Sequence, residues 1–122
     1  MEKRHTYPKT LRLSGKLNFA GVYDARMREM RGPVTIYAKP NDLKYARLGL
    51  SISRRVGTAP RRNKIKRLLR ESFRLMQHDF PRGYDWIIAV RPHVPLQLAD
   101  YQSILMDLMK RLHAAWIKRE SA

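Results

Sequence analysis

Alternating apolar and polar residues in the first half of the chain predict two β-strands. Residues 34–39 and 46–54 both follow this period of two, which is typical of half-buried strands. The turn residues Pro40, Asn41 and Asp42 lie between them, so we expect an antiparallel pair joined by a short loop. One face would carry Val34, Ile36, Ala38, Leu48, Leu50 and Ile52, and the other Thr35, Tyr37, Lys39, Gly49, Ser51 and Ser53.

Apolar residues at helical spacing predict three helices. The first runs from about residue 16 to 26 with Ser14 as a candidate N-cap. The second begins near Pro60, with Thr58 as its candidate cap, because proline suits a first helical turn. The third is amphipathic and covers about residues 98–118.

Residues 84–90, Tyr-Asp-Trp-Ile-Ile-Ala-Val, are nearly continuously apolar. Such a run is expected of a strand that is well covered on at least one face. The order of elements is then helix, strand, strand, helix, strand, helix, which predicts an α+β sandwich with few strands. The chain has 122 residues, so we expect a single domain, with flexible tails at 1–10 and 119–122.

Composition points to a polyanionic partner. Lys and Arg number 26 against 10 Asp and Glu, which gives a formal net charge of +16. Such an excess opposes compaction and attracts nucleic acid or an anionic membrane surface. The apolar stripe of the third predicted helix suits packing on a sheet better than lying on a membrane, so no membrane partner is expected. The chain has no cysteine and no recognisable signal peptide, and the cytoplasm is the default compartment.

The positive charge is concentrated between residues 54 and 70, which hold eight basic side chains and no acidic one. On a helix the apolar residues of this region gather on one side. Asn63, Lys66, Arg67, Arg70 and Arg74 fall within an arc of about 100° on another side. Burial of the apolar side offsets repulsion along the basic one, since each buried Leu, Ile or Phe contributes roughly 1.5–3 kcal/mol.

This region resembles the signature of the bacterial ribonuclease P protein subunits, an Arg-Asn-x-x-Lys-Arg-x-x-Arg pattern after a Gly-x-Ala turn. The matching positions are Gly57, Ala59, Arg62, Asn63, Lys66, Arg67 and Arg70. The segments Leu-Gly-Leu-Ser-Ile-Ser-Arg-Arg at 48–55 and Asp-Trp-Ile-Ile-Ala-Val-Arg at 85–91 are also similar, as is the segment 13–23. Pro60 and Arg61 depart from the commonest pattern, in which small apolar residues precede the motif.

The resemblance implies a two-layer αβββαβα sandwich with a small, mainly antiparallel central sheet. It also implies a left-handed βαβ crossover, although a right-handed one is the general default. The implied function is to bind a catalytic RNA, in a 1:1 complex, and the 5′ leader of precursor tRNA, so that the leader is removed endonucleolytically. Catalysis would belong to the RNA, with Mg²⁺ held mainly by RNA. No catalytic side chain, bound metal or obligate protein partner is expected of this chain.

Two sets of candidate RNA-binding residues follow. The planar donors of arginine suit phosphates, and Asn63 can both donate and accept hydrogen bonds, although the same charges also suit a solvated surface. Tyr37 lies opposite the apolar face of its strand, which favours a stacking platform for bases over the alternative of a core role. The catalytic-RNA set is Arg54, Arg55, Arg61, Arg62, Asn63, Lys66, Arg67 and Arg70; the leader set is Phe19, Tyr23, Tyr37, Ser51 and Ser53.

Other chemistry is poorly supported. His5, His78, His93 and His113 are scattered without metal-ligand spacing, and no pair of carboxylates forms a catalytic constellation. Two other functions stay open from the residues alone: a ribosome-associated binding protein and a double-stranded DNA binder. A groove-reading helix has little need of a stacking platform, so the aromatic residues favour a single-stranded ligand.

Overall fold

The computed structural model describes residues 12–121 and has the predicted αβββαβα order. The flexible tail predicted at residues 1–10 lies outside the described residues. A short 3₁₀ turn, η2, precedes the second helix. The elements are α1 (Lys16–Asp24), β1 (Arg28–Arg31), β2 (Val34–Pro40), β3 (Arg47–Ser51), η2 (Arg54–Val56), α2 (Ala59–Met76), β4 (Tyr84–Val90) and α3 (Leu98–Glu120).

The four strands form one mixed sheet in the order β1-β2-β4-β3. β2 pairs antiparallel with both β1 and β4, whereas β3 and β4 are parallel. The predicted pairing of β2 with β3 is therefore wrong, because β4 lies between them. The physical reason is the nearly continuous apolar sequence of β4, in which the first five residues are buried. Only a central strand covered on both faces buries such a run.

The strand β1 has no apolar alternation, and residue pattern alone did not predict it. It lies at the sheet edge with mostly exposed side chains. A two-residue turn, Gly32-Pro33, joins it to β2, and Gly32 has a φ of 57°. Glycine takes this left-handed conformation without steric cost, as the first residue of a hairpin turn requires. The Gly32-Pro33 turn thus lets β1 pair with β2, although the side chains of β1 do not have the alternating pattern of a strand.

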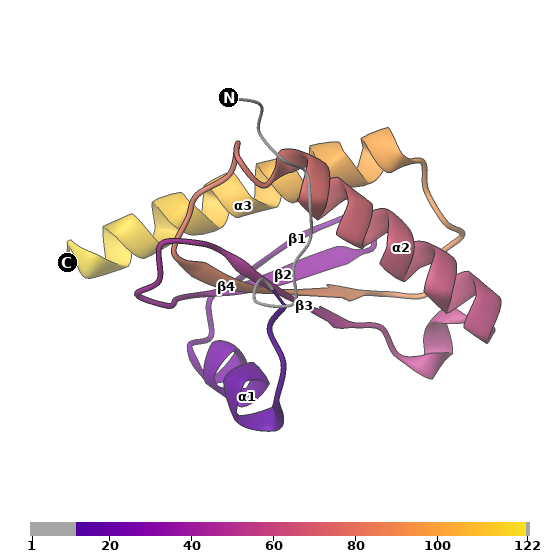
Figure 1. Cartoon of the computed structure of the whole chain (residues 1–122), viewed down its shortest axis with the longest axis horizontal. Coiled ribbons are helices and arrows are strands. Elements are labelled where there is room, and N and C mark those ends of the chain that lie inside the picture. The colour runs from indigo at the N-terminus through magenta and orange to yellow at the C-terminus, as the bar shows by residue number, and fades with distance from the viewer. Residues whose placement is uncertain (1–11, 122) are drawn as a thin grey trace.

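Helices α2 and α3 pack together on one face of the sheet, and α1 lies against the other (Figure 1). This confirms the two-layer sandwich and adds partial cover by α1. The core between the helices and the sheet includes Ile36, Trp86 and Ile88 from the strands, all fully buried. Ile65, Leu69, Phe73, Leu105, Leu108 and Leu112 contribute from the helices.

Several element ends differ from the prediction. The backbone N-cap of α1 is Gly15 instead of Ser14, and Thr58 caps α2 without a side-chain hydrogen bond. β3 ends at Ser51 and not at Arg54, because the chain turns into η2, where Val56 is buried. α3 continues through Glu120, so the start of the tail expected at 119–122 is helical.

The guanidinium of Arg119 in this last helical turn donates a 3.0 Å hydrogen bond to the carbonyl of Ala25.

The connection from β3 through α2 to the parallel strand β4 is the expected βαβ crossover. The left-handedness of this crossover is implied by the family resemblance alone and stays a prediction. Within residues 12–121, no helix combines the length and apolar character needed to cross a membrane.

Candidate nucleic-acid interface

The sheet face that carries α1 presents an ordered row of side chains. Strand register sets Tyr37 of β2 beside Ile87 of β4, and Ile87 beside Gly49 of β3. Arg28 of β1 is the partner of Tyr37 on the other side, so this row crosses all four strands. Alternation of side chains along each strand puts the residues of the row on the same face.

Three predicted aromatic residues meet over this row. The Tyr23 and Tyr37 rings are in edge-to-face contact, with centroids 4.8 Å apart, and the Phe19 and Tyr23 centroids lie 6.4 Å apart. All three rings are partly buried against a small apolar cluster of Leu13, Val22 and Ile87. The prediction that these rings share one surface is confirmed as geometry. We call Phe19, Tyr23 and Tyr37 the aromatic row.

Phe19 reaches the sheet only because residue 49 is glycine. A Cβ atom at Gly49 would lie 2.6 Å from the Cζ atom of the Phe19 ring, closer than real Cβ contacts allow. Gly49 is buried beneath the ring. The missing side chain in β3 therefore makes the seat for one end of the aromatic row.

The two serines of the leader set are placed differently. Ser51 is exposed in β3 and pairs with Ala89, which in turn pairs with Thr35, so these three form a second row beside the aromatic one. Ser53 lies beyond the end of β3, where its carbonyl accepts a hydrogen bond from Val56 in η2. Sequence analysis placed Thr35 on the same face as Tyr37 and Ser51 but did not single out Ala89, because the position of Ala89 depends on β4 lying between β2 and β3.

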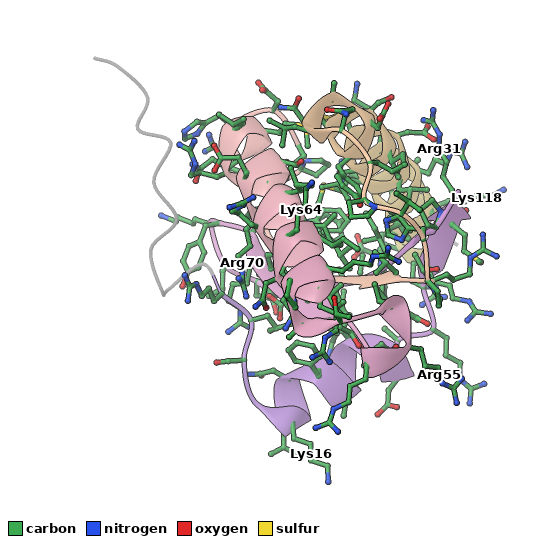
Figure 2. All side chains as sticks on the ribbon, turned by 90° about the vertical axis from the view of Figure 1, so that its right-hand side faces the viewer. Lys16, Arg31, Arg55, Lys64, Arg70 and Lys118 are labelled. Carbon is green, nitrogen blue, oxygen red and sulfur yellow. The ribbon has the colours of Figure 1, made fainter. Side chains whose placement is uncertain are left out.

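Helix α2 separates its apolar and basic sides as predicted. Ile65, Leu69, Ser72, Phe73 and Met76 are buried. Figure 2 shows Arg70 on the side of α2 away from α3, and Arg55 in η2. The structure brings the predicted catalytic-RNA residues onto one continuous stretch, η2 and the first three turns of α2. We call Arg54, Arg55, Arg61, Arg62, Asn63, Lys66, Arg67 and Arg70 the basic surface.

No carboxylate of residues 12–121 forms an ion pair with the basic surface. The acidic side chains that do form ion pairs have other arginines as partners, among them Glu71 with Arg74, and Asp107 with both Arg31 and Arg111. Figure 2 shows Arg31 beside α3, far from Arg70. The predicted arc also contained Arg74, and its pairing with Glu71 sets it apart from the free cations. The basic surface thus keeps its full charge for an external anion.

The buried carboxylate of Asp85 has a structural role. It accepts hydrogen bonds of 2.8 and 2.7 Å from Nε and Nη2 of Arg47, and one of 2.8 Å from the Asn41 amide. The hydrogen bond to Asp85 raises the pKa of Arg47 above its ordinary value, although partial burial opposes the shift. A bidentate pair of this kind fixes the parallel register of β3 on β4.

Two histidines in the described part of the chain lie within hydrogen-bond distance of tyrosine hydroxyls. The ring of His113 lies 2.9 Å from the hydroxyl of Tyr84, and the ring of His93 lies 2.7 Å from the hydroxyl of Tyr101. Burial raises the pKa of both tyrosines above the ordinary value. Across residues 12–121, no group of three or more His, Asp or Glu side chains is arranged to hold a metal ion.

Comparison with known proteins decides the family. The sequence profile of the family Ribonuclease P matches residues 7–116. The chain belongs to the ribonuclease P protein family. The ribonuclease P protein component of Photobacterium profundum is 37% identical over 107 residues, covering 87% of this chain and 91% of that protein. That of Photorhabdus laumondii is 42% identical over 89 residues, covering 72% and 74%.

Solved structures of ribonuclease P proteins share the fold. The protein from Thermotoga maritima superposes with a TM-score of 0.75 at 28% identity, covering 82% of this chain and 96% of that one. The protein from Staphylococcus aureus gives a TM-score of 0.74 at 27% identity, covering 84% and 94%. As a family member, this chain is a protein subunit of the ribonuclease P endoribonuclease, acts in tRNA processing and has an RNA partner in a ribonucleoprotein.

The seat of Phe19 generates a stability prediction. Gly49→Ala introduces a methyl group into the space of the Phe19 ring, and we expect it to lower the free energy of unfolding by roughly 1–3 kcal/mol, as overpacking does. Phe19→Ala removes the clash, so the double variant should lose less than the sum of the two single losses. Denaturant unfolding of the three variants measures the coupling.

Gly21→Ala is the matched control for this series. A Cβ at Gly21, in α1, would make only an ordinary contact, 3.5 Å from Nζ of Lys39, and alanine favours a helix. This variant should unfold at the same or a higher denaturant concentration than the wild type. Additive losses at positions 19 and 49 would show that the ring does not depend on the glycine.

Proposed function

We propose that this subunit binds the catalytic RNA of ribonuclease P, in a 1:1 complex, through the basic surface, and the 5′ leader of precursor tRNA on the aromatic row. The bound leader is thereby presented to the RNA for endonucleolytic removal, which creates the mature 5′ end of the tRNA. The observation that carries the proposal is the division of one small domain into an unpaired cationic surface and a separate aromatic surface.

The basic surface suits a folded RNA partner. Its cations have no carboxylate partner within residues 12–121, so phosphates compete with solvent alone for them. Arginine presents planar pairs of donors that match phosphate oxygens, and Asn63 both donates and accepts hydrogen bonds. Phosphate contacts give position and salt-dependent affinity without reading sequence.

The aromatic row suits an unpaired strand. Every base has a π-face, so stacking on Phe19, Tyr23 and Tyr37 tolerates any leader sequence, as an enzyme with many precursors requires. Ser51, at the edge of the same face, adds an exposed hydroxyl that donates or accepts a hydrogen bond. Ser53 contributes from the start of η2, between this face and the basic surface.

Catalysis in this proposal belongs to the RNA, with Mg²⁺ held mainly by RNA phosphates. Mg²⁺ prefers hard oxygen ligands and keeps several waters, which phosphate oxygens accommodate well. Within residues 12–121, no group of three or more His, Asp or Glu side chains is arranged to hold a metal ion, and Glu71, Asp85 and Asp107 are paired with arginines. The chain supplies binding and orientation of the substrate.

Cleavage of precursor tRNA at low Mg²⁺ tests the proposed function. The catalytic RNA should cleave a precursor poorly alone at low Mg²⁺ and well with this protein, since added cations reduce repulsion between the two RNAs. The product ends are measured on gels, with the RNA alone at high Mg²⁺ as the positive control. Unchanged cleavage at low Mg²⁺, with RNA that is active at high Mg²⁺, would refute the proposal.

Replacement of three cations of the basic surface should weaken assembly without unfolding the protein. Arg62→Ala, Lys66→Ala and Arg70→Ala together remove contacts worth roughly 10- to 100-fold in affinity for the catalytic RNA. The slope of log affinity against log salt should fall by about 3, one for each phosphate contact. Titration of the RNA at several salt concentrations and circular dichroism measure the two properties.

The control for that variant removes three exposed cations from other elements: Lys44→Ala, Arg82→Ala and Lys110→Ala. It has the same net charge, so it separates local contacts from the general field of the protein. An equal loss of affinity in the two triple variants would contradict a defined binding surface on α2.

Tyr37→Ala should weaken long-leader precursors selectively. Loss of one stacking partner weakens binding by roughly 1–3 kcal/mol per base. Mature tRNA has no leader, so its affinity should not change. Tyr37→Phe keeps the ring and should bind normally, and Tyr45→Ala removes an exposed tyrosine from the loop before β3 as a control. Affinity is measured against leader length with the assembled enzyme; a deficit independent of length would place the leader elsewhere.

A further inference from the structure

Two arginines lie at the β1 end of the aromatic row: Arg26 in the turn between α1 and β1, and Arg28 at the start of β1. Arg26 and Arg28 line a pocket of about 330 Å³ together with Tyr23 and Tyr37. Both arginines are exposed, and Arg28 is the register partner of Tyr37. Two guanidinium groups thus border the contact between two aromatic rings.

Neither guanidinium has a hydrogen-bond or carboxylate partner among residues 12–121. Three other arginines, by contrast, have such partners: Arg47 pairs with Asp85, Arg31 with Asp107, and Arg119 donates to the carbonyl of Ala25. Arg26 and Arg28 lie on the face opposite α3, outside the basic surface of α2. Their charge is therefore uncompensated at the β1 end of the aromatic row.

The backbone at Arg26 is strained. Its φ of 54° is in the left-handed region, where the other non-glycine residue of the described part of the chain is Asp42. Aspartate takes this conformation readily, whereas arginine does so at a cost that glycine would avoid. Such outliers are retained where a side chain is needed at that place.

The strained turn is held from two sides. The amide of Arg26 donates to the carbonyl of Tyr23 at 3.0 Å, and the carbonyl of Ala25 accepts the hydrogen bond from Arg119 of α3. Arg119 itself stacks over the Trp116 ring at 4.7 Å, and the indole of Trp116 donates to the carbonyl of Ala38 in β2. The last turn of α3 therefore fixes the turn that positions Arg26.

We propose that Arg26 and Arg28 form a phosphate clamp for a single-stranded nucleic acid whose bases stack on the aromatic row. The clamp rests on the proposed function, because it takes a phosphodiester of the same leader. Three strand spacings of about 4.8 Å separate β1 from β3, so the clamp lies roughly 14 Å across the sheet from the Gly49 seat. Only a leader long enough to cross the sheet reaches it.

Removal of the clamp should affect long leaders alone. The variant Arg26→Gly with Arg28→Ala relaxes the strained backbone and removes both charges, so its thermal midpoint should be unchanged or higher. Its holoenzyme should bind long-leader precursor roughly 3- to 10-fold more weakly and short-leader precursor normally. For the long-leader precursor, the slope of log affinity against log salt concentration should fall by about 0.7, the value for one phosphate of a single strand.

A methylphosphonate scan of the leader identifies the phosphate. One neutral linkage should weaken binding to the wild type and have no further effect on the variant. Arg82→Ala with Lys110→Ala removes two charges elsewhere and should keep the full response to that linkage. Arg26→Asn with Arg28→Ala, in which asparagine also tolerates the left-handed backbone, should repeat the loss caused by Arg26→Gly with Arg28→Ala.

The outcomes separate the clamp from the proposed function. The clamp is wrong, and the leader surface stands, if wild-type affinity rises with leader length and the variant follows the same curve. The same conclusion holds if every neutral linkage lowers the affinity of both proteins equally. If wild-type affinity is independent of leader length, both proposals are wrong. An equal loss in the control variant would also overturn the clamp, because general charge would then explain it.

Discussion

The burial of β4 on both faces is the constraint on which the rest of this structure depends. Trp86 and Ile88 face the helices, while Ile87 faces α1, and all three are fully buried. A strand of this kind must lie inside the sheet, so it separates β2 from β3 and makes β3 its parallel neighbour. The parallel pair requires a crossover, and α2, with the basic surface, is that crossover.

The same strand arranges the opposite face. Ile87 supports the aromatic row from below, and its register partners are Tyr37 on one side and Gly49 on the other. The ring of Phe19 then lies against the bare backbone of Gly49. The two surfaces of the proposed function are therefore linked through one strand: α2 is tied to β4 by connectivity, and the aromatic row is tied to it by packing.

Much of the fold was predictable because local patterns were strong. The apolar stripe of α2 and the alternation in β2 arise from side chains within one element, and both predictions were correct. Strand pairing was predicted wrongly because proximity in sequence favoured a β2–β3 hairpin. The continuous apolar run of β4 was the contrary signal, but it fixes burial and not which strands lie beside it.

The candidate site was predictable to the extent that it lies on periodic elements. The aromatic row follows from the helical spacing of Phe19 and Tyr23 and from the alternation around Tyr37. Ser53 was assigned by extending a strand that ends at Ser51, where Val56 draws the chain into η2. Arg26 lies in a turn with no periodicity, and its position depends on a φ angle and on Arg119.

Separation of charge explains how so basic a chain tolerates its own repulsion. Within residues 12–121, no acidic side chain forms an ion pair with the basic surface: Asp85 fixes β3 on β4, Asp107 joins α3 to β1, and Glu71, although it lies on α2, pairs with Arg74. The basic surface is left exposed, where ions screen its charges over about 8–10 Å, and the buried stripe of α2 offsets the rest. An anion that binds only the folded chain stabilises it by mass action. Uncompensated charge that weakens the free protein thus becomes a source of affinity and of added stability once RNA is bound.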